Sequence, residues 1–139
     1  MKMIECNFSI FDSSFSLNDD FYYIIFMSKD KILSNIISEK FNKKFNIIDN
    51  FSQIDLSQCN ALLIGKVFTL FIKKESYDIL SESLLQSSLL KLKEICNSDG
   101  IKELHLSKLN LTDTEYTIFK SKLFSVFNDT DITFILFSF

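Results

Sequence analysis

Apolar and polar positions along the 139-residue chain follow two periods, one typical of strands and one typical of helices. The run FYYIIFM at Phe21–Met27 is aromatic and aliphatic throughout, which predicts a central strand covered on both faces. Further apolar runs predict strands at Met3–Phe11, Ala61–Ile64, Val67–Ile72, Ile101–Leu106 and Ile132–Phe139. Only Gly65 and Lys66 separate the second of these runs from the third, which predicts a tight hairpin.

Apolar residues at helical spacing predict helices at about residues 30–44, 77–96 and 113–127. Asp30 stands where the N-cap of the first helix is expected. Gly100 is expected to end the second helix, because glycine readily adopts the left-handed conformation found at helix C-termini. Thr112–Glu115 (TDTE) matches the capping-box pattern that opens a helix, here the third.

Strand and helix segments alternate along the chain, so we predict an α/β fold. The expected architecture is a three-layer α/β/α sandwich with a mixed, mostly parallel central sheet. No proline- or glycine-rich linker, repeat or charge block divides the sequence, and residues 1–139 are predicted to form a single domain. The polar side chains of Lys31, Glu39, Lys91 and Lys122 are expected to face water.

Composition excludes one class of function. The net charge is −3 and all 15 basic residues are lysines, which excludes a strongly basic nucleic-acid binder. The chain has 16 phenylalanines but only two glycines, and it lacks proline, tryptophan and arginine. Residues with GC-rich codons are the scarce ones, which indicates an AT-rich genome such as that of a virus, phage, parasite or endosymbiont.

Cysteine and histidine usage indicates neither disulfides nor a metal site. Three cysteines stand far apart with no CxxC pair: Cys6, Cys59 and Cys96. This sparse, odd set is typical of reduced intracellular thiols. The single histidine, His105, has no cysteine nearby, so no metal or other cofactor is expected. Its strand position favours a packed histidine over a general base. The sequence shows no signal peptide and no apolar run long enough to span a membrane, so we expect a soluble intracellular protein.

Three stretches carry a resemblance to a known family. The first, Cys6-Asn7-Phe8, follows the opening strand. The second begins with Ser28-Lys29-Asp30 after the central strand and ends with Glu39–Phe45 (EKFNKKF) at the end of the first helix. The third, Leu70–Lys74 (LFIKK), precedes the second helix and the Gly100 stop. This order resembles a macro domain, the ADP-ribose-binding fold, and in particular the branch that contains the terminal ADP-ribose protein glycohydrolase.

The resemblance also exposes what this sequence lacks. Macro domains hold the diphosphate and distal ribose with two glycine-rich loops, whose positions fall at Ile32–Ile37 and Ser107–Leu111. Neither segment contains a glycine. The resemblance implies a lysine nucleophile whose position falls near Leu62 or Leu63, and an aspartate whose place Asp113 can take. The capping box already explains Asp113, so capping is favoured over catalysis and we do not expect an enzyme.

Ser28 and Asp30 match positions that line the family's ligand cleft. If ligand binding is retained, Ser28, Asp30 and Asn110 are the residues expected to bind the ligand. Helix capping is the favoured interpretation of Asp30, and the cleft is expected to be filled by Leu33, Ile36, Leu109 and Leu111. Phenylalanines near the C-terminus are expected to leave an apolar edge open to a partner: Phe134, Phe137 and Phe139.

We therefore expect a degenerate macro-domain-like protein that acts as a non-catalytic binding or scaffolding module. Its expected partner is another protein or a second copy of the chain. The alternative is binding of ADP-ribose or a related nucleotide with residual ADP-ribosyl hydrolase activity, through Ser28, Asp30 and Asp113. RNA binding is a weaker alternative, because the acidic balance disfavours it.

Overall fold

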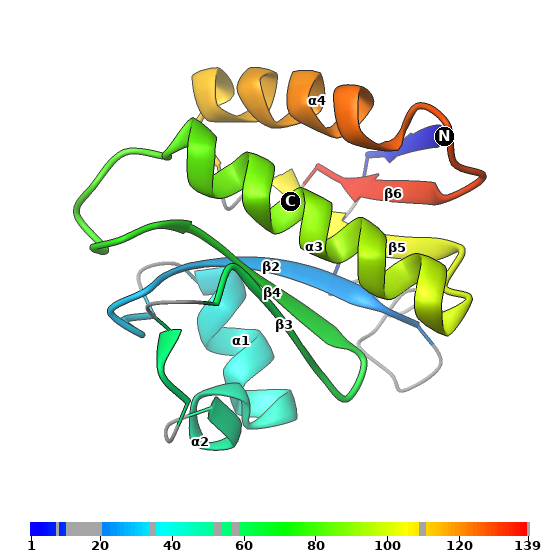
Figure 1. Ribbon diagram of the computed structural model, residues 1–139. Helices are drawn as coiled ribbons and strands as arrows, with labels where there is room; N and C mark the ends of the chain where they lie inside the picture. Colours follow the sequence, from blue (N-terminus) through cyan, green and yellow to red (C-terminus); the bar gives the residue numbers. More distant parts are fainter. Residues whose placement is uncertain are drawn as a thin grey trace.

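The computed structural model describes residues 1–7, 9–10, 21–33, 36–51, 54–56, 59–108 and 111–138. A six-stranded sheet lies between α3 and α4 on one face and α1 and α2 on the other (Figure 1). In chain order the elements are β1 (Lys2–Cys6), β2 (Tyr23–Ser28), α1 (Ile36–Phe45), α2 (Ile47–Phe51), β3 (Ala61–Ile64), β4 (Val67–Lys73), α3 (Glu82–Asp99), β5 (Glu103–Ser107), α4 (Asp113–Phe127) and β6 (Thr133–Phe137).

The predicted α/β/α sandwich with a mixed, mostly parallel sheet is confirmed. The strand order is β1-β6-β5-β2-β4-β3. Each described strand pairs parallel to its neighbours except β3, which runs antiparallel to β4 through the predicted hairpin. Gly65 has a φ of 59° in that turn, a conformation that glycine adopts without strain.

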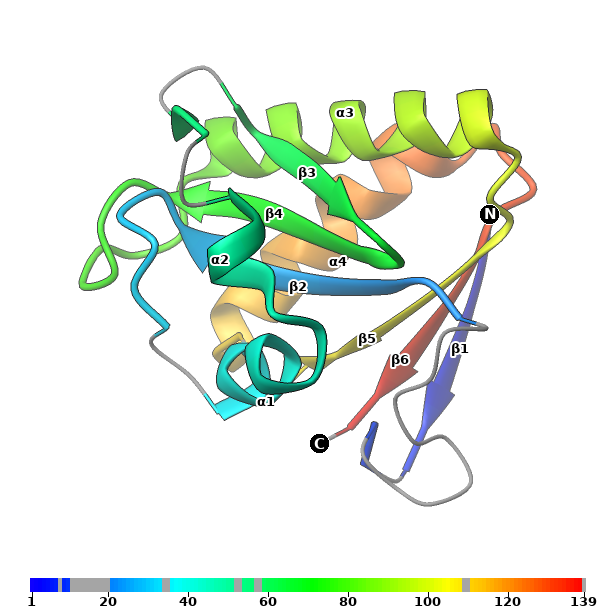
Figure 2. The ribbon, with the colours of Figure 1, turned by 90° about the horizontal axis from the view of Figure 1, so that it is seen from below.

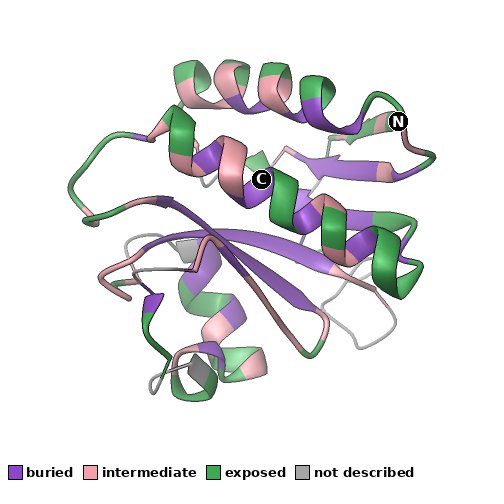
Figure 3. Ribbon diagram, viewed as in Figure 1, coloured by how far each residue is buried: buried purple, intermediate pink, exposed green. Residues whose placement is uncertain are grey.

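Two apolar cores cover the two faces of the sheet. Alternate residues of β2 enter opposite cores, and every residue of the strand is buried (Figure 3). Toward α3 and α4, the Phe26 ring meets the Phe119 ring edge-on at 5.3 Å. Toward α1, Tyr23 meets Phe41 in the same way at 5.3 Å. The uninterrupted apolar run therefore forms a strand that is covered on both faces, as the sequence predicts.

The aromatic strands are buried as predicted, but only two of the four polar residues expected to face water are exposed. Glu39 and Lys91 are exposed, whereas Lys31 and Lys122 are half-buried because their amines approach the Ile54 carbonyl and the Glu82 carboxylate. Two of the phenylalanines expected at an open edge, Phe134 and Phe137, are fully buried, because β6 lies between β1 and β5 rather than at the edge. Phe139 lies outside the described residues.

The first predicted helix begins later than expected. Helix α1 starts at Ile36, so Asp30 is not its N-cap and the capping interpretation of Asp30 is wrong. Lys31 adopts a φ of 63°, and Asp30 accepts a hydrogen bond from the backbone N–H of Ile32 instead of from a helix. The short helix α2 has no counterpart among the predicted elements.

The bounds of the other two helices agree more closely with the predicted bounds. Helix α3 begins at Glu82 rather than near Tyr77, because the Ser81 hydroxyl caps it by accepting the Leu84 N–H at 3.3 Å. Gly100 ends it in the left-handed conformation, as predicted. Helix α4 spans the predicted residues and opens with the predicted capping box between Thr112 and Glu115.

A β-bulge at the end of β4 is the main irregularity of the described sheet. Met27 pairs with Phe71 but Ser28 pairs with Lys73, so Ile72 is the extra residue. The Phe71 carbonyl accepts a 3.1 Å hydrogen bond from the buried Ser88 hydroxyl of α3, and the Ile72 carbonyl accepts the Ser81 N–H at 2.8 Å. The bulge is therefore held by α3 and not by the sheet alone.

This arrangement makes Ser88 a test of how the sheet end is held. The single proton of the Ser88 hydroxyl is shared between the Phe71 carbonyl and the Leu84 carbonyl of its own helix, which lies 2.6 Å away. Replacing Ser88 with alanine removes this shared donor, which costs about 1 kcal/mol of unfolding free energy. We expect urea denaturation of Ser88→Ala to show that loss. The matched control Ser87→Ala, on the same helix but only half-buried, should stay within about 0.5 kcal/mol of the wild type. Equal midpoints for the two variants would contradict a role for Ser88.

Candidate functional site

The carboxyl ends of β2, β4 and β5 meet at one edge of the sheet. Ser28 and Lys73 are register partners there, and Ser107 ends the neighbouring strand β5. The loops that follow β2 and β4 lie side by side in two perpendicular views (Figures 1 and 2). In open α/β sheets, ligands bind outside such carboxyl ends. We call this region the carboxyl edge.

Asp30 lies at the centre of the carboxyl edge and connects its loops. One carboxylate oxygen accepts hydrogen bonds from the buried Ser28 hydroxyl and from the Ile32 N–H, the latter at 3.1 Å. The other oxygen accepts the Ser76 N–H of the β4–α3 loop at 2.7 Å. Burial of the carboxyl raises the pKa of Asp30, but these hydrogen bonds outweigh it and hold that pKa below its ordinary value.

The arrangement brings the predicted pair Ser28 and Asp30 together but directs both inward. The Ser28 hydroxyl donates its hydrogen bond to Asp30, and the Asp30 carboxylate accepts hydrogen bonds from backbone N–H groups of two loops. A carboxylate that already accepts such donors leaves them unavailable to an incoming phosphate. The pair therefore works as an internal tie at this edge.

A charged pocket adjoins Asp30, with a volume of about 620 Å³. We call it the lysine pocket, and it is lined by Lys29, Asp30, Lys31, Ile54, Asp55, Leu56, Lys74 and Glu75. The Lys29 amine approaches the Asn60 side-chain oxygen at 3.4 Å, and the Lys31 amine donates to the Ile54 carbonyl at 3.2 Å. The pocket combines lysines at its walls with the apolar side chains of Ile54 and Leu56.

A second hollow lies on the other side of the β4–α3 loop, with a volume of about 400 Å³. We call it the apolar groove, and it is lined by Lys73, Asp78, Ile79, Leu80, Thr112, Thr114, Glu115 and Ile118. Glu115 joins its walls. One carboxylate oxygen accepts the Thr112 N–H at 3.0 Å within the capping box, and the other accepts the Leu80 N–H at 3.2 Å.

Asp113, the candidate for the family's catalytic aspartate, is exposed in the first turn of α4. It lines neither the lysine pocket nor the apolar groove. Negative charge at this position is favourable beside a helix N-terminus whatever else the residue does. The position thus fits the capping interpretation, and a catalytic role for Asp113 stays a prediction.

Lys73 is a candidate that the sequence alone missed. The family's lysine was placed near Leu62 or Leu63, but both lie on the antiparallel strand β3 and pack against the cores. Lys73 instead stands at the carboxyl edge, in register with Ser28 and beside the apolar groove. Residues in register share a face of the sheet, and the bulge at Ile72 brings Lys73 to the face that Ser28 occupies. The sequence signal that could have identified Lys73 is the Lys73-Lys74 pair, which ends a buried apolar run.

The residues expected to fill the cleft are only partly described. Leu33 packs against the core on the α1 face, and Leu111 packs against the core on the α3 and α4 face. Leu109, Asn110 and the side chain of Ile36 lie outside the described residues. The ligand-binding expectation for Asn110 therefore stays a prediction.

His105 is packed, as its strand position favoured. Its ring is buried, stacks on Phe21 with centroids 4.5 Å apart, and lies 3.0 Å from a Glu103 carboxylate oxygen.

Burial raises the pKa of the Cys96 thiol to about 12, with the nearby Asp99 charge adding to the effect, so this thiol is unreactive near neutral pH. Within the described ranges, no three His, Cys, Asp or Glu side chains are placed to hold a metal ion.

No helix in the described part of the chain combines the length and apolar character needed to cross a bilayer.

Comparison with known proteins identifies the fold. No family model and no curated protein matches the chain. Among solved structures, the macrodomain of Mycobacterium tuberculosis DarG superposes with a TM-score of 0.77 at 9% identity, over 97% of this chain and 96% of that one. The chain has the macrodomain fold. The macrodomain of Thermus aquaticus DarG gives a TM-score of 0.70 at 9% identity, over 98% and 97% of the two chains. A macrodomain protein of Streptomyces coelicolor gives 0.63 at 6% identity, over 99% of each.

The low pKa of Asp30 makes part of the stability of this protein depend on pH. A carboxyl whose pKa is lower in the folded state stabilises that state fully above its ordinary value, 3.8, and progressively less as the pH falls through the lowered pKa. We therefore expect wild-type stability in urea to decline below about pH 4. Asp30→Asn should lose about 1–2 kcal/mol at pH 7 and decline less steeply below pH 4.

Asp99→Asn, a change at an exposed residue that ends α3, is the control for removing one negative charge. It should stay within about 0.5 kcal/mol of the wild-type stability at pH 7. Identical pH profiles for Asp30→Asn and the wild type would show that Asp30 is not an internal tie.

Proposed function

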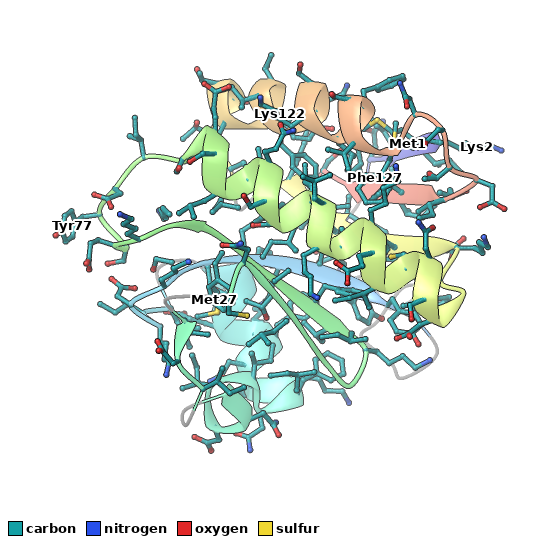
Figure 4. All side chains as sticks on the ribbon, viewed as in Figure 1. Met1, Lys2, Met27, Tyr77, Lys122 and Phe127 are labelled. Atoms are coloured by element: carbon teal, nitrogen blue, oxygen red, sulfur yellow. The ribbon has the colours of Figure 1, made fainter. Side chains whose placement is uncertain are left out.

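We propose that this macrodomain is a non-catalytic binding module that contacts a protein partner at its carboxyl edge. One observation carries the proposal: the β4–α3 loop (residues 74–81) presents Tyr77 and Ile79 to solvent, 83% and 86% exposed. Figure 4 shows Tyr77 projecting away from the body of the molecule. Large apolar side chains displayed together are typical of protein interaction sites.

The internal use of hydrogen-bond donors at the carboxyl edge also supports a protein partner over a nucleotide. A diphosphate that leaves water needs donors to replace its hydration. Here the N–H groups of Ile32 and Ser76 are bound to Asp30, and the N–H of Leu80 is bound to Glu115. The positions of the two family loops contain no glycine, so backbone cannot approach a ligand as closely there.

Capture of partners from an extract of the source organism tests this proposal. The immobilised wild-type chain should retain a protein that the double variant Tyr77→Ser/Ile79→Ser loses, because each side chain gains about 1.5–3 kcal/mol on leaving water. Phe124→Ser removes an apolar side chain that is 57% exposed on α4 and is the matched control. It should retain the same protein as the wild type. Equal capture by all three chains would overturn the proposal.

Binding of ADP-ribose or a related nucleotide, with residual ADP-ribosyl hydrolysis, is the second candidate, and the position of Lys73 favours it. A lysine amine is the kind of nucleophile that the family resemblance implies, and Lys73 stands beside the apolar groove in register with Ser28. In its neutral form such an amine can attack the anomeric carbon of a glutamate-linked ADP-ribosyl group and displace the glutamate carboxylate. Water then hydrolyses the amine–ribosyl bond, which releases ADP-ribose and regenerates the amine. The acids near it are Asp78 and Glu115 of the groove wall.

Titration with ADP-ribose separates the two candidates. For a protein-binding module we expect no calorimetric heat at millimolar ADP-ribose and no release of ADP-ribose from glutamate-ADP-ribosylated protein. Micromolar binding, with turnover abolished in Lys73→Ala but kept in the neighbouring control Lys74→Ala, would establish the second candidate instead. Binding without turnover would make the protein an ADP-ribose module and overturn the preference for a protein partner.

A further inference from the structure

The described sheet ends at two edge strands, β1 and β3, which differ in charge. Strand β1 carries the exposed side chains of Lys2 and Glu5, and charged side chains on an edge strand oppose pairing with another chain. Strand β3 (Ala61–Ile64, ALLI) has no charged residue and no proline, and its register with β4 is regular. Figure 2 shows β3 at the margin of the sheet. The β3 edge therefore lacks the usual protection against strand addition.

The backbone of Leu63 points away from the sheet. The Phe71 N–H donates to the Asn60 carbonyl at 3.0 Å, so these two residues form a hydrogen-bonded pair of the antiparallel ladder. Such pairs alternate with non-bonded ones, so the N–H and C=O groups of Ala61 and Leu63 face outward. The Ala61 carbonyl accepts a hydrogen bond from the Cys59 thiol at 3.4 Å. Within the described part of the chain, no hydrogen bond reaches the Leu63 backbone, and an extended backbone beside it would supply both partners.

A hollow of about 440 Å³ lies between this edge and α3. We call it the edge groove, and it is lined by Ala61, Leu62, Leu63, Lys91, Glu94, Ile95, Ser98 and Asp99. Ala61 and Leu63 share the face of β3 that packs on the α3 core, and the short Ala61 side chain leaves room beneath the helix. A strand added beside β3 would direct every second side chain into this groove. Half-buried Ile95 provides an apolar contact there.

The charges of the edge groove favour a cationic group. Lys91 is paired with Glu94 at 3.5 Å, whereas Asp99 is exposed in the last turn of α3. That turn contains no basic residue, so the Asp99 carboxylate and the C-terminal carbonyls of the helix make this end of the groove negative. A lysine or arginine of a partner is stabilised at such a position.

We propose that the edge groove binds an extended peptide segment of a partner protein, which adds to the described sheet as a strand beside β3. The backbone of the segment bonds to Leu63, its alternate apolar side chains contact Ile95, and a basic residue lies near Asp99. This mode of recognition combines main-chain hydrogen bonds for affinity with side-chain pockets for specificity. The edge groove shares no lining residue with the lysine pocket or the apolar groove, so this contact is independent of Tyr77 and Ile79.

Selection from a phage-displayed library of random linear peptides tests the groove. The library is first depleted on Leu63→Pro, which loses the outward N–H but is tolerated on an edge strand, and is then selected on the wild type. We expect peptides with alternating apolar residues and a lysine or arginine. In fluorescence anisotropy, Leu63→Pro should weaken binding of a selected peptide by about tenfold or more, and Leu63→Val should bind like the wild type.

Charge reversal tests the cationic end of the peptide. Asp99→Lys should weaken binding of the selected peptide by about tenfold, because it places like charges together. Glu82→Lys, at the other end of α3 and outside the groove lining, is the matched control and should bind like the wild type. Peptides without a basic residue, or equal binding by the two variants, would overturn the assigned chemistry of the partner.

Amide hydrogen exchange of the wild type detects strand addition without any variant. With the selected peptide bound, the Leu63 N–H should exchange about tenfold more slowly or less, because it then donates to the peptide backbone. The Tyr77 N–H of the β4–α3 loop is the control and should be unaffected. A library that yields no peptide, or a Leu63 N–H that stays unprotected, would overturn the proposal. Protection that appears without peptide as the chain concentration rises would also overturn it, by placing a second copy at this edge.

Discussion

Burial of β2 on both faces is the constraint on which the rest of this fold depends. The strand pairs in parallel with β4 on one side and with β5 on the other, and all its side chains are buried. Each neighbour must therefore return to the same end of the sheet through a helix on one face or the other. Because the strands run in one direction, their following loops converge at the carboxyl edge. The position of the candidate site therefore follows from the parallel pairing of β2 with β4 and β5.

At that edge, carboxylates act as structural ties. Asp30 joins the loops after β2 and β4, and Glu115 joins the β4–α3 loop to α4. Away from that edge, Glu5 ties β1 to α4, accepting hydrogen bonds from the Tyr116 hydroxyl at 2.9 Å and from the Lys120 amine at 3.4 Å. The Tyr116 hydrogen bond and the Lys120 charge lower the pKa of Glu5. The described loops at the carboxyl edge are thus held together by acidic side chains.

The fold was predictable from the sequence because its signals are local. Periodicity located the strands and helices, Gly100 marked one helix end, and the Thr112–Glu115 pattern marked one helix start. The start of α1 was not predictable from spacing, because Asp30 bonds to Ser76, a residue 46 positions away. Long-range partners of this kind leave no periodic trace in a sequence.

The candidate site was predictable only in part for the same reason. Ser28 and Asp30 were singled out from the family resemblance, and they do lie together. Lys73 was missed because a β-bulge, which depends on Ser81 and Ser88 of a later segment, sets its register. The exposure of Tyr77 and Ile79 was not predicted, because the spacing of apolar residues there also fits a helix.

The sheet order carries a consequence for how the chain folds during synthesis. In the described sheet β1 is bonded to β6 alone, with Lys2 opposite Thr133, so the ribosome releases the first strand long before its neighbour exists. Until β6 emerges, β5 presents an open edge and β1 has no place in the sheet. A stalled or shortened chain would expose both apolar faces around that gap, which gives incomplete products a route to aggregation or to capture by chaperones.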